Sequence, residues 1–277
     1  MNTIEFYDRE GSSETRYFSV DRSKRRYHLK RFVACTNIIQ QYTTPGITVM
    51  DLGAGEGMFT NWLSMKGFRV LACDLSRSYL ARVKTQTPDC DTILCSAEAL
   101  PIRSKAIQLS LAIDVLEHVP RLQQAVKEVG RITSQSIVIS MPVNSFYRRF
   151  AALLGIDLAR YDDEVGHIHV LAPSTLTRLL VLLEREGLRQ VRLVKIFSLV
   201  PTLAKIVPTS AIQKIIETTL LRAFGSSNHV IIVYQSAPAW AATPYPTKLQ
   251  WQKLHEFTLY AFQSRIGLTF SQGSNRW

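Results

Sequence analysis

The chain has 277 residues, of which 46% are hydrophobic and 20% charged, and its formal net charge is +11 at pH 7. A chain of this length and composition can bury a substantial hydrophobic core. No run of about 18 uninterrupted apolar residues occurs, which argues against a membrane-spanning helix. The polar start of the chain, Met1–Glu10, does not have the pattern of a signal peptide. We therefore expect a cytoplasmic protein.

The first 42 residues predict a basic helical region. Its apolar residues, including Leu29, Phe32 and Ile38, interleave with the charges, which predicts a helix that packs one side on the rest of the protein. The charge fits a solvated helix face, an RNA partner or an anionic membrane surface, and no recognised RNA-binding module accompanies it. The basic residues are Arg22, Lys24, Arg25, Arg26, Lys30 and Arg31.

A glycine-rich turn, Asp51–Gly57, is the most informative motif of the chain. It follows an apolar run, Ile47–Met50, and precedes residues that predict a helix, Met58–Met65. In an open α/β sheet, such a strand–turn–helix unit binds nucleotide-like ligands. The spacing differs from the dinucleotide fingerprint G-x-G-x-x-G, and Asp51 would repel a pyrophosphate. A carboxylate here instead favours the ammonium and sulfonium of S-adenosylmethionine.

Three further strand-and-turn units follow in order. The run Arg69–Cys73 predicts a strand that ends at Asp74, about 20 residues beyond the turn, where a carboxylate can hold ribose hydroxyls. Thr92–Cys95 predicts a third strand, before Ser96–Pro101. Ile107–Ile113 predicts a fourth strand, which leads into Asp114–Pro120.

Hydrophobic periodicity predicts the remaining elements. Apolar spacing indicates a helix over Leu122–Ile132 and another over Leu176–Leu183, the second closed by Gly187 as a C-terminal glycine. Strands are predicted at Ser136–Met141, Val191–Phe197 and His229–Tyr234.

These ordered motifs resemble the class I S-adenosylmethionine-dependent methyltransferases, especially the group that acts on quinones, lipids and other small molecules. The resemblance covers Thr43–Gln235. It implies an α/β fold, a Rossmann-like seven-stranded and mostly parallel sheet with helices on both faces and an antiparallel last strand. We expect residues 1–42 to form the basic region and 43–236 the methyltransferase domain, with a helical insertion at about 198–226. Residues 237–277 form a tail without an assigned role.

The resemblance also implies S-adenosyl-L-methionine as cofactor and a set of binding residues. Asp51 is expected to accept from the methionine ammonium, directly or through water, and Asp74 from the ribose hydroxyls. Asp114 either lines the site or caps the next helix. The predicted cofactor-binding residues are Asp51, Gly53, Ala54, Gly55, Asp74, Leu75, Ser96, Ala97 and Asp114.

Catalytic residues are less evident, because the sulfonium already activates the methyl group and the enzyme chiefly needs to align a nucleophile and exclude water. The candidates are His118, His167 and His169, each of which is also compatible with a structural role. His167 and His169 have the spacing of a metal-binding pair, but no third ligand is apparent, so no metal site is predicted. The four cysteines, which contain no C-x-x-C pair, are interpreted as reduced thiols.

The predicted function is transfer of a methyl group by direct displacement to a small, largely apolar acceptor such as a quinone, lipid or aromatic metabolite. An apolar helical stripe in the insertion, around Ile212 and Ile215, could cover the core, line the acceptor cavity or touch a membrane surface peripherally. A tRNA or RNA base methyltransferase is the first alternative, and a non-catalytic cofactor-binding assembly factor is the second. The acceptor and the oligomeric state are left open.

Overall fold

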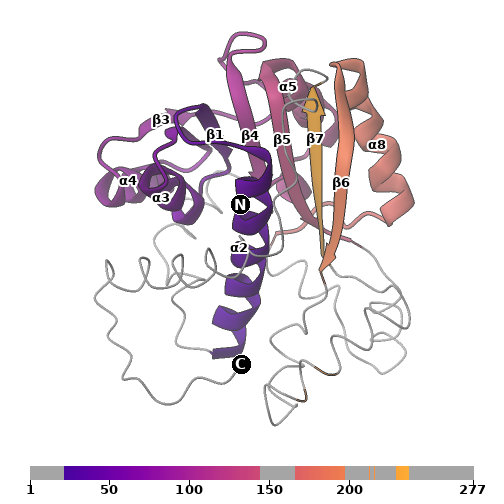
Figure 1. Cartoon of the computed structure of the whole chain (residues 1–277), viewed down its shortest axis with the longest axis horizontal. Helices are drawn as coiled ribbons and strands as arrows, with labels where there is room; N and C mark the ends of the chain where they lie inside the picture. Colours follow the sequence, from indigo (N-terminus) through magenta and orange to yellow (C-terminus); the bar gives the residue numbers. More distant parts are fainter. Residues whose placement is uncertain (1–21, 144–165, 197–211, 213–214, 216–228, 237–277) are drawn as a thin grey trace. The chain divides into compact units, whose positions relative to one another are not determined.

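The computed structural model describes residues 22–143, 166–196, 212, 215 and 229–236, all within one compact unit, Met1–Ala242. Seven strands and five α-helices are seen in this part of the chain (Figure 1). The strands are β1 Thr48–Leu52, β2 Arg69–Asp74, β3 Asp91–Leu94, β4 Ile107–Ile113, β5 Thr133–Pro142, β6 Leu188–Ile196 and β7 His229–Ser236. The helices are α2 Arg22–Tyr42, α3 Met58–Met65, α4 Arg77–Gln86, α5 Leu122–Ile132 and α8 Pro173–Arg185, with a short 3-10 helix η1 at Leu116–His118.

The seven strands form one sheet in the order β3-β2-β1-β4-β5-β7-β6. Strands β1 to β5 pair in parallel, and β7 runs antiparallel to both of its neighbours, β5 and β6. The predicted fold class is therefore confirmed. Because β1 lies between β2 and β4, the turns that follow these three strands meet at one edge of the sheet, where open α/β sheets bind ligands.

Successive side chains of a strand point to opposite faces of the sheet. Different helices pack on these two faces. Met50 and Leu52 of β1 join the cluster that also contains buried residues of α5 and α8. On the other face, Phe32 of α2 packs against Phe59 and Trp62 of α3, with ring centroids 4.9 and 6.5 Å apart. Figure 1 shows α2 crossing one face, with α3 and α4 beside β1 and α8 on the β6 side.

The basic helix is present as α2, and Phe32 and Ile38 are buried on its packed side as expected, but two polar residues join them there. His28 and Arg31 are buried together with Phe32, Cys35 and Ile39, whereas Leu29 and Val33 are only partly buried. Two polar side chains of the basic region thus point into the protein, and this brings them to the ligand-binding edge of the sheet.

Several predicted features lie outside the described residues. They include the tail 237–277 and the insertion, of which the structure describes Ile212 and Ile215, both exposed. No helix in the described part of the chain is long and apolar enough to cross a membrane. All four cysteines are described, and all are free thiols.

The packing of α8 against α5 provides a test of the core. Leu180 is fully buried in the cluster that joins α8 to the sheet, so Leu180→Ala removes buried methyl groups and leaves a cavity. We expect it to lower the free energy of unfolding by about 2–5 kcal/mol, measured by chemical denaturation. Val181→Ala, at the exposed neighbouring position, is the control and should change the value by less than about 0.5 kcal/mol. Equal losses in both variants would contradict this packing.

Candidate functional site

A pocket lies at the carboxyl ends of β1, β2 and β4. Counted out to its open mouth, it encloses about 1090 Å³. Eight of the nine predicted cofactor-binding residues line it, and Asp51 does not. The eight are Gly53, Ala54, Gly55, Asp74, Leu75, Ser96, Ala97 and Asp114.

The glycine turn after β1 forms the floor of the pocket and requires glycine at its first position. The backbone of Gly53 has φ +67°, and a Cβ there would lie 2.4 Å from Cγ2 of Val115. Its N–H donates to the carbonyl of Cys73 over 2.7 Å. The turn is thereby drawn onto the end of β2, and a side chain at Gly53 would force it away.

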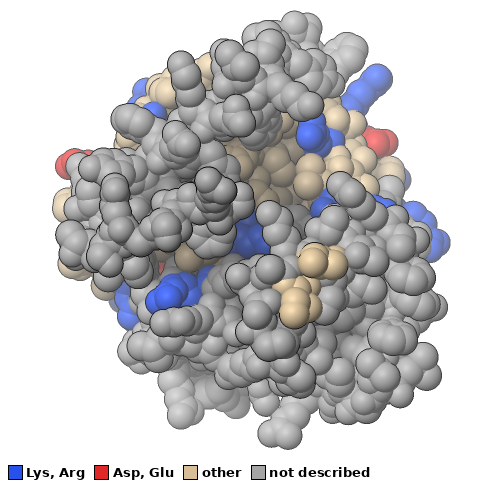
Figure 2. Space-filling model, turned by 60° about the horizontal axis from the view of Figure 1, so that its bottom comes forward, with Lys and Arg blue, Asp and Glu red and all other residues tan. Residues whose placement is uncertain are grey.

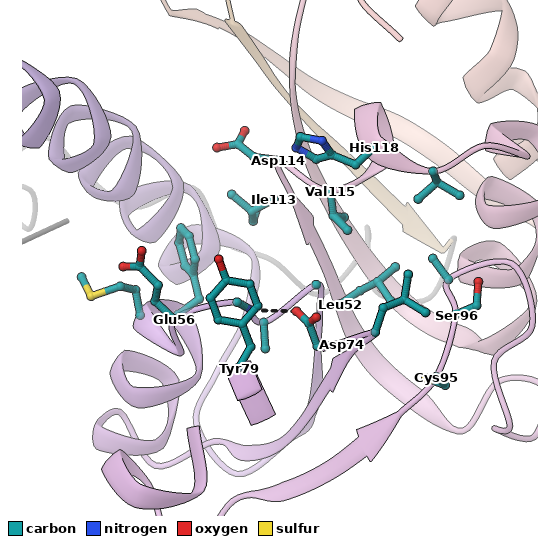
Figure 3. Close-up of a pocket in the computed structure, with 18 of the residues that line it drawn as sticks. Leu52, Glu56, Asp74, Tyr79, Cys95, Ser96, Ile113, Asp114, Val115 and His118 are labelled. Carbon is teal, nitrogen blue, oxygen red and sulfur yellow. Dashed lines mark hydrogen bonds between the residues drawn. The ribbon is translucent and has the colours of Figure 1, made fainter. Parts of the chain in front are cut away.

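Asp74 holds the other side of the turn. Its Oδ2 accepts from the N–H of Gly55 and its Oδ1 from the N–H of Ser76, both over 2.9 Å. A carboxylate has about four lone-pair sites, so these two hydrogen bonds alone do not fill it. Figure 3 shows Asp74 projecting into the pocket. The arrangement suits the two hydroxyls of a ribose.

Asp51 lies beneath the turn rather than in the pocket wall. It is 2% exposed, and its Oδ2 accepts from the Thr60 hydroxyl over 2.6 Å. Burial raises the pKa of Asp51 to about 6, and the negative charge of Asp74 adds to this, while the Thr60 hydrogen bond opposes it. Ionising this carboxylate is costly in the cofactor-free protein. A bound cation near the turn would offset that cost.

The predicted adenine-side residues follow β3. Ser96 lines the pocket, and its hydroxyl accepts from the N–H of Glu98 over 3.2 Å. Ala97 also lines it and is nearly buried. The contact of these two residues with adenine stays a prediction.

Asp114 links four elements at the opposite end of the pocket. Its Oδ1 accepts from the Ser140 hydroxyl of β5 over 2.9 Å and from Nε2 of His229 in β7 over 2.6 Å. Its Oδ2 forms an ion pair with Arg31 of α2. Asp114 does not cap the next helix, because the residue before η1 is Val115. Its left-handed backbone, φ +54°, directs it into this cluster.

The charges of this cluster determine its protonation. Burial alone would raise the pKa of Asp114, but the Arg31 charge and the His229 and Ser140 hydrogen bonds outweigh it and hold the pKa well below its usual range. Burial lowers the pKa of His229, with Asp114 opposing that effect. The group is therefore an Arg31–Asp114 ion pair with a neutral His229 that donates from Nε2.

Three polar residues of this site were not predicted from the sequence. His28 and Arg31 line the pocket, and Nδ1 of His28 accepts from Arg31 over 3.2 Å. The sequence did contain a signal for these two residues, because His28 and Arg31 precede Cys35 and Ile39 at helical intervals and so share one side of the helix with them. His229 offered none, because its position depends on the antiparallel register that pairs it with Pro142.

Two of the three candidate histidines, His118 and His167, lie together, and His169 lies apart from them. His118 lines the pocket, and its Nδ1 lies 2.8 Å from the carbonyl oxygen of Gly166. The ring of His167 packs against His118, with centroids 5.0 Å apart. Nε2 of His169 lies 3.1 Å from the carbonyl oxygen of Val119, away from that pair. His167 and His169 therefore do not act together, although both follow Gly166.

Known proteins with similar sequences are methyltransferases over part of this chain. Residues 50–138 match the model of a methyltransferase domain. A malonyl-[acyl-carrier protein] O-methyltransferase of Hamiltonella defensa is 32% identical over 91 residues, 33% of this chain and 35% of that protein. The biotin biosynthesis bifunctional protein BioHC of Cellvibrio japonicus is 28% identical over 85 residues, 30% of this chain and 17% of that protein. The chain thus spans about a third or less of these relatives.

Solved structures share the fold over a longer stretch. An S-adenosylmethionine-dependent methyltransferase of Thermotoga maritima aligns with a TM-score of 0.59 at 16% identity, covering 84% of this chain and 99% of that one. One from Archaeoglobus fulgidus gives 0.53 at 17%, covering 76% and 94%. Residues 50–138 therefore match a methyltransferase domain in sequence, and the fold of the chain is that of these S-adenosylmethionine-dependent methyltransferase structures. S-adenosylmethionine is named as the cofactor of both of these structures.

Asp74 provides a direct test of the cofactor site. Asp74→Asn removes the charge and one acceptor oxygen from the position expected to hold the ribose. We expect calorimetry to show binding of S-adenosylmethionine and S-adenosylhomocysteine weakened about 10- to 100-fold, or roughly 1.5–3 kcal/mol. Asp91→Asn, at the exposed start of β3, is the control and should bind both ligands as the unaltered chain does. Unchanged affinity in Asp74→Asn would exclude this ribose site.

Asp51 predicts a dependence of stability on pH. The pKa of Asp51 in the folded protein is about 6, above the value of about 3.9 in the unfolded chain. Its contribution to the free energy of unfolding is therefore fully present below about pH 4 and is lost as the pH rises through about 6. Asp51→Asn should therefore stabilise the cofactor-free protein by up to about 3 kcal/mol at pH 8 and have little effect near pH 4. The same variant should bind S-adenosylmethionine more weakly.

Denaturant unfolding at the two pH values measures the first effect, and calorimetry measures the second. Destabilisation of the cofactor-free protein at pH 8 would show that the Asp51 charge supports the fold rather than the ligand.

Proposed function

We propose that the protein transfers a methyl group from S-adenosylmethionine to a small, largely apolar acceptor that carries at least one polar group. The observation that supports this most is the continuity of the pocket. Figure 3 shows Asp74 and Ser96 at one end and Asp114 and His118 at the other. Because residues of both ends line one pocket, a cofactor at one end and an acceptor at the other can meet within it.

The end of the pocket that carries Asp114 is lined by apolar side chains as well. An apolar wall favours an apolar body in the acceptor and excludes water from the reacting atoms. The apolar residues of the pocket wall include Met58, Phe59, Ile113, Val115, Val119 and Pro120.

The polar groups at the same end favour an acceptor with an oxygen that can form hydrogen bonds. His28, Arg31 and His118 line it, and the whole chain has a net charge of +11. Lys and Arg side chains also lie beside a hollow on the face that Figure 2 turns forward. The name of one relative specifies a malonyl group as substrate, and a carboxylic acid is compatible with this arrangement.

The chain's contribution to the reaction is alignment and exclusion of water. When bound, S-adenosylmethionine supplies a methyl group already activated by its sulfonium. Asp74 would hold the ribose, and the turn at Gly53 would let the backbone approach the cofactor closely. His118 faces the acceptor end, where a base is needed only for an acceptor that must lose a proton.

The alternatives predict different products. A tRNA or RNA base methyltransferase uses the basic residues of α2 to contact phosphates, and its affinity falls steeply with salt. An assembly factor binds the cofactor and transfers nothing. Peripheral contact with a membrane would favour acceptors that partition into lipid.

The direct test is incubation of the full chain with methyl-labelled S-adenosylmethionine and four classes of acceptor: a quinol, a fatty acid, an acyl-carrier-bound dicarboxylate and tRNA. We expect a product heavier by one methylene unit with one of the first three. Label in tRNA would establish the first alternative. Cofactor binding without a product from cell extracts that contain small molecules would support the second.

Glycine variants test whether transfer depends on the turn. Gly53→Ala should abolish cofactor binding and transfer, because the added Cβ would lie 2.4 Å from Val115 on a backbone with φ +67°. Gly46→Ala is a matched control. It has φ +91° but nothing within 4 Å of the added Cβ, so it carries the same kind of backbone strain away from the pocket. Gly46→Ala should retain methyl transfer. Loss of transfer in both variants would show that the effect comes from impaired folding.

A further inference from the structure

Three side chains of the types that bind metals meet beside the acceptor end of the pocket. Glu117 and His118 belong to η1, directly after β4, and His167 comes from the segment before α8. The potential ligand atoms of all three lie within 4.8 Å of one another. Nε2 of His167 is 3.9 Å from Oε1 of Glu117.

Backbone hydrogen bonds fasten the two parts of this cluster together. The N–H groups of Ile168 and His169 both donate to the carbonyl oxygen of Glu117, over 2.8 and 3.0 Å. Nδ1 of His118 lies 2.8 Å from the carbonyl oxygen of Gly166. That oxygen can only accept, so Nδ1 carries the proton and Nε2 carries the lone pair. Metal-binding histidines are commonly oriented in this way, by donating the other ring N–H to a carbonyl.

Burial indicates why a cation suits this place. Glu117 is 0% exposed, and a positive charge beside a carboxylate at such depth favours its ionised form. A divalent ion supplies it. Two imidazole nitrogens and one carboxylate oxygen form a typical partial ligand set for divalent transition metals, with further positions open. Around bonds of about 2.0–2.2 Å, ligand atoms lie roughly 3–3.5 Å apart, so the side chains need to draw in by about 1 Å.

We propose that Glu117, His118 and His167 bind one divalent transition-metal ion next to the acceptor end of the pocket. His118 lines that pocket and lies with Asp114 at the end away from Asp74 (Figure 3). The open coordination positions would take water or an oxygen of the acceptor. Metal binding itself stands independently, and only the acceptor contact rests on the proposed function.

Metal titration of the untagged full chain tests the site without any methyl transfer. After treatment with a chelator, we expect calorimetry with Zn²⁺ or Mn²⁺ to show one bound ion, and Co²⁺ to give the visible absorption of a coordinated ion. His167→Gln and Glu117→Gln each remove one ligand and should weaken binding at least tenfold. His169→Gln is the matched control, since its Nε2 lies at the Val119 carbonyl outside the cluster, and should bind as the unaltered chain does.

The melting temperature and the cofactor affinity of each variant show whether it is folded. His167→Gln is the decisive variant, because replacing the fully buried Glu117 could disturb the fold itself. Failure of the unaltered chain to bind metal, or equal affinity in His167→Gln and His169→Gln, would overturn the proposal. The first result would leave Glu117 and His167 as buried neighbours without a metal, with His167 Nε2 3.9 Å from Glu117 Oε1. Neither result would affect methyl transfer, which is measured separately.

Discussion

The buried carboxylate of Asp114 is the interaction on which the acceptor end of the pocket depends. It accepts from Ser140 and His229 and forms an ion pair with Arg31, so it joins β4, β5, β7 and the N-terminal helix at one point. Removing one member of such a buried group leaves a charge or donor without compensation, which typically costs about 3–5 kcal/mol. The cluster therefore couples the position of α2 to the order of the sheet. Because α2 carries His28 and Arg31 into the pocket, the same cluster shapes the space available to an acceptor.

The two ends of the pocket are built by different physical means. At the cofactor end, backbone geometry dominates, since the glycine turn and Asp74 form a nearly continuous set of main-chain hydrogen bonds. At the acceptor end, charged and polar side chains from distant segments dominate, including His28, Arg31 and His118. The first arrangement tolerates little variation, while the second can change with the substrate.

The sequence was sufficient for the sheet and the cofactor end because their signals are local. An apolar run followed at once by a glycine turn or by an acid is a contiguous pattern, so Gly53 and Asp74 could each be placed from their neighbours alone. Arg31 could not, because a basic residue within a basic cluster is usually solvated and its burial follows only from the packing of Phe32 on α3. His229 depended on strand register, and the meeting of Glu117 with His167 depended on a contact across about 50 residues. Long-range contacts of this kind leave no pattern in a single sequence.

A crystal structure of the full chain with S-adenosylhomocysteine would test the central claim most directly. The claim is that the turn after β1 and Asp74 hold the cofactor, while α2 closes the acceptor end. The account predicts ribose hydroxyls on the Asp74 carboxylate and the cofactor sulfur facing the end formed by Arg31, Asp114 and His118. A nucleoside bound elsewhere, or an Asp74 carboxylate without ligand contact, would contradict it.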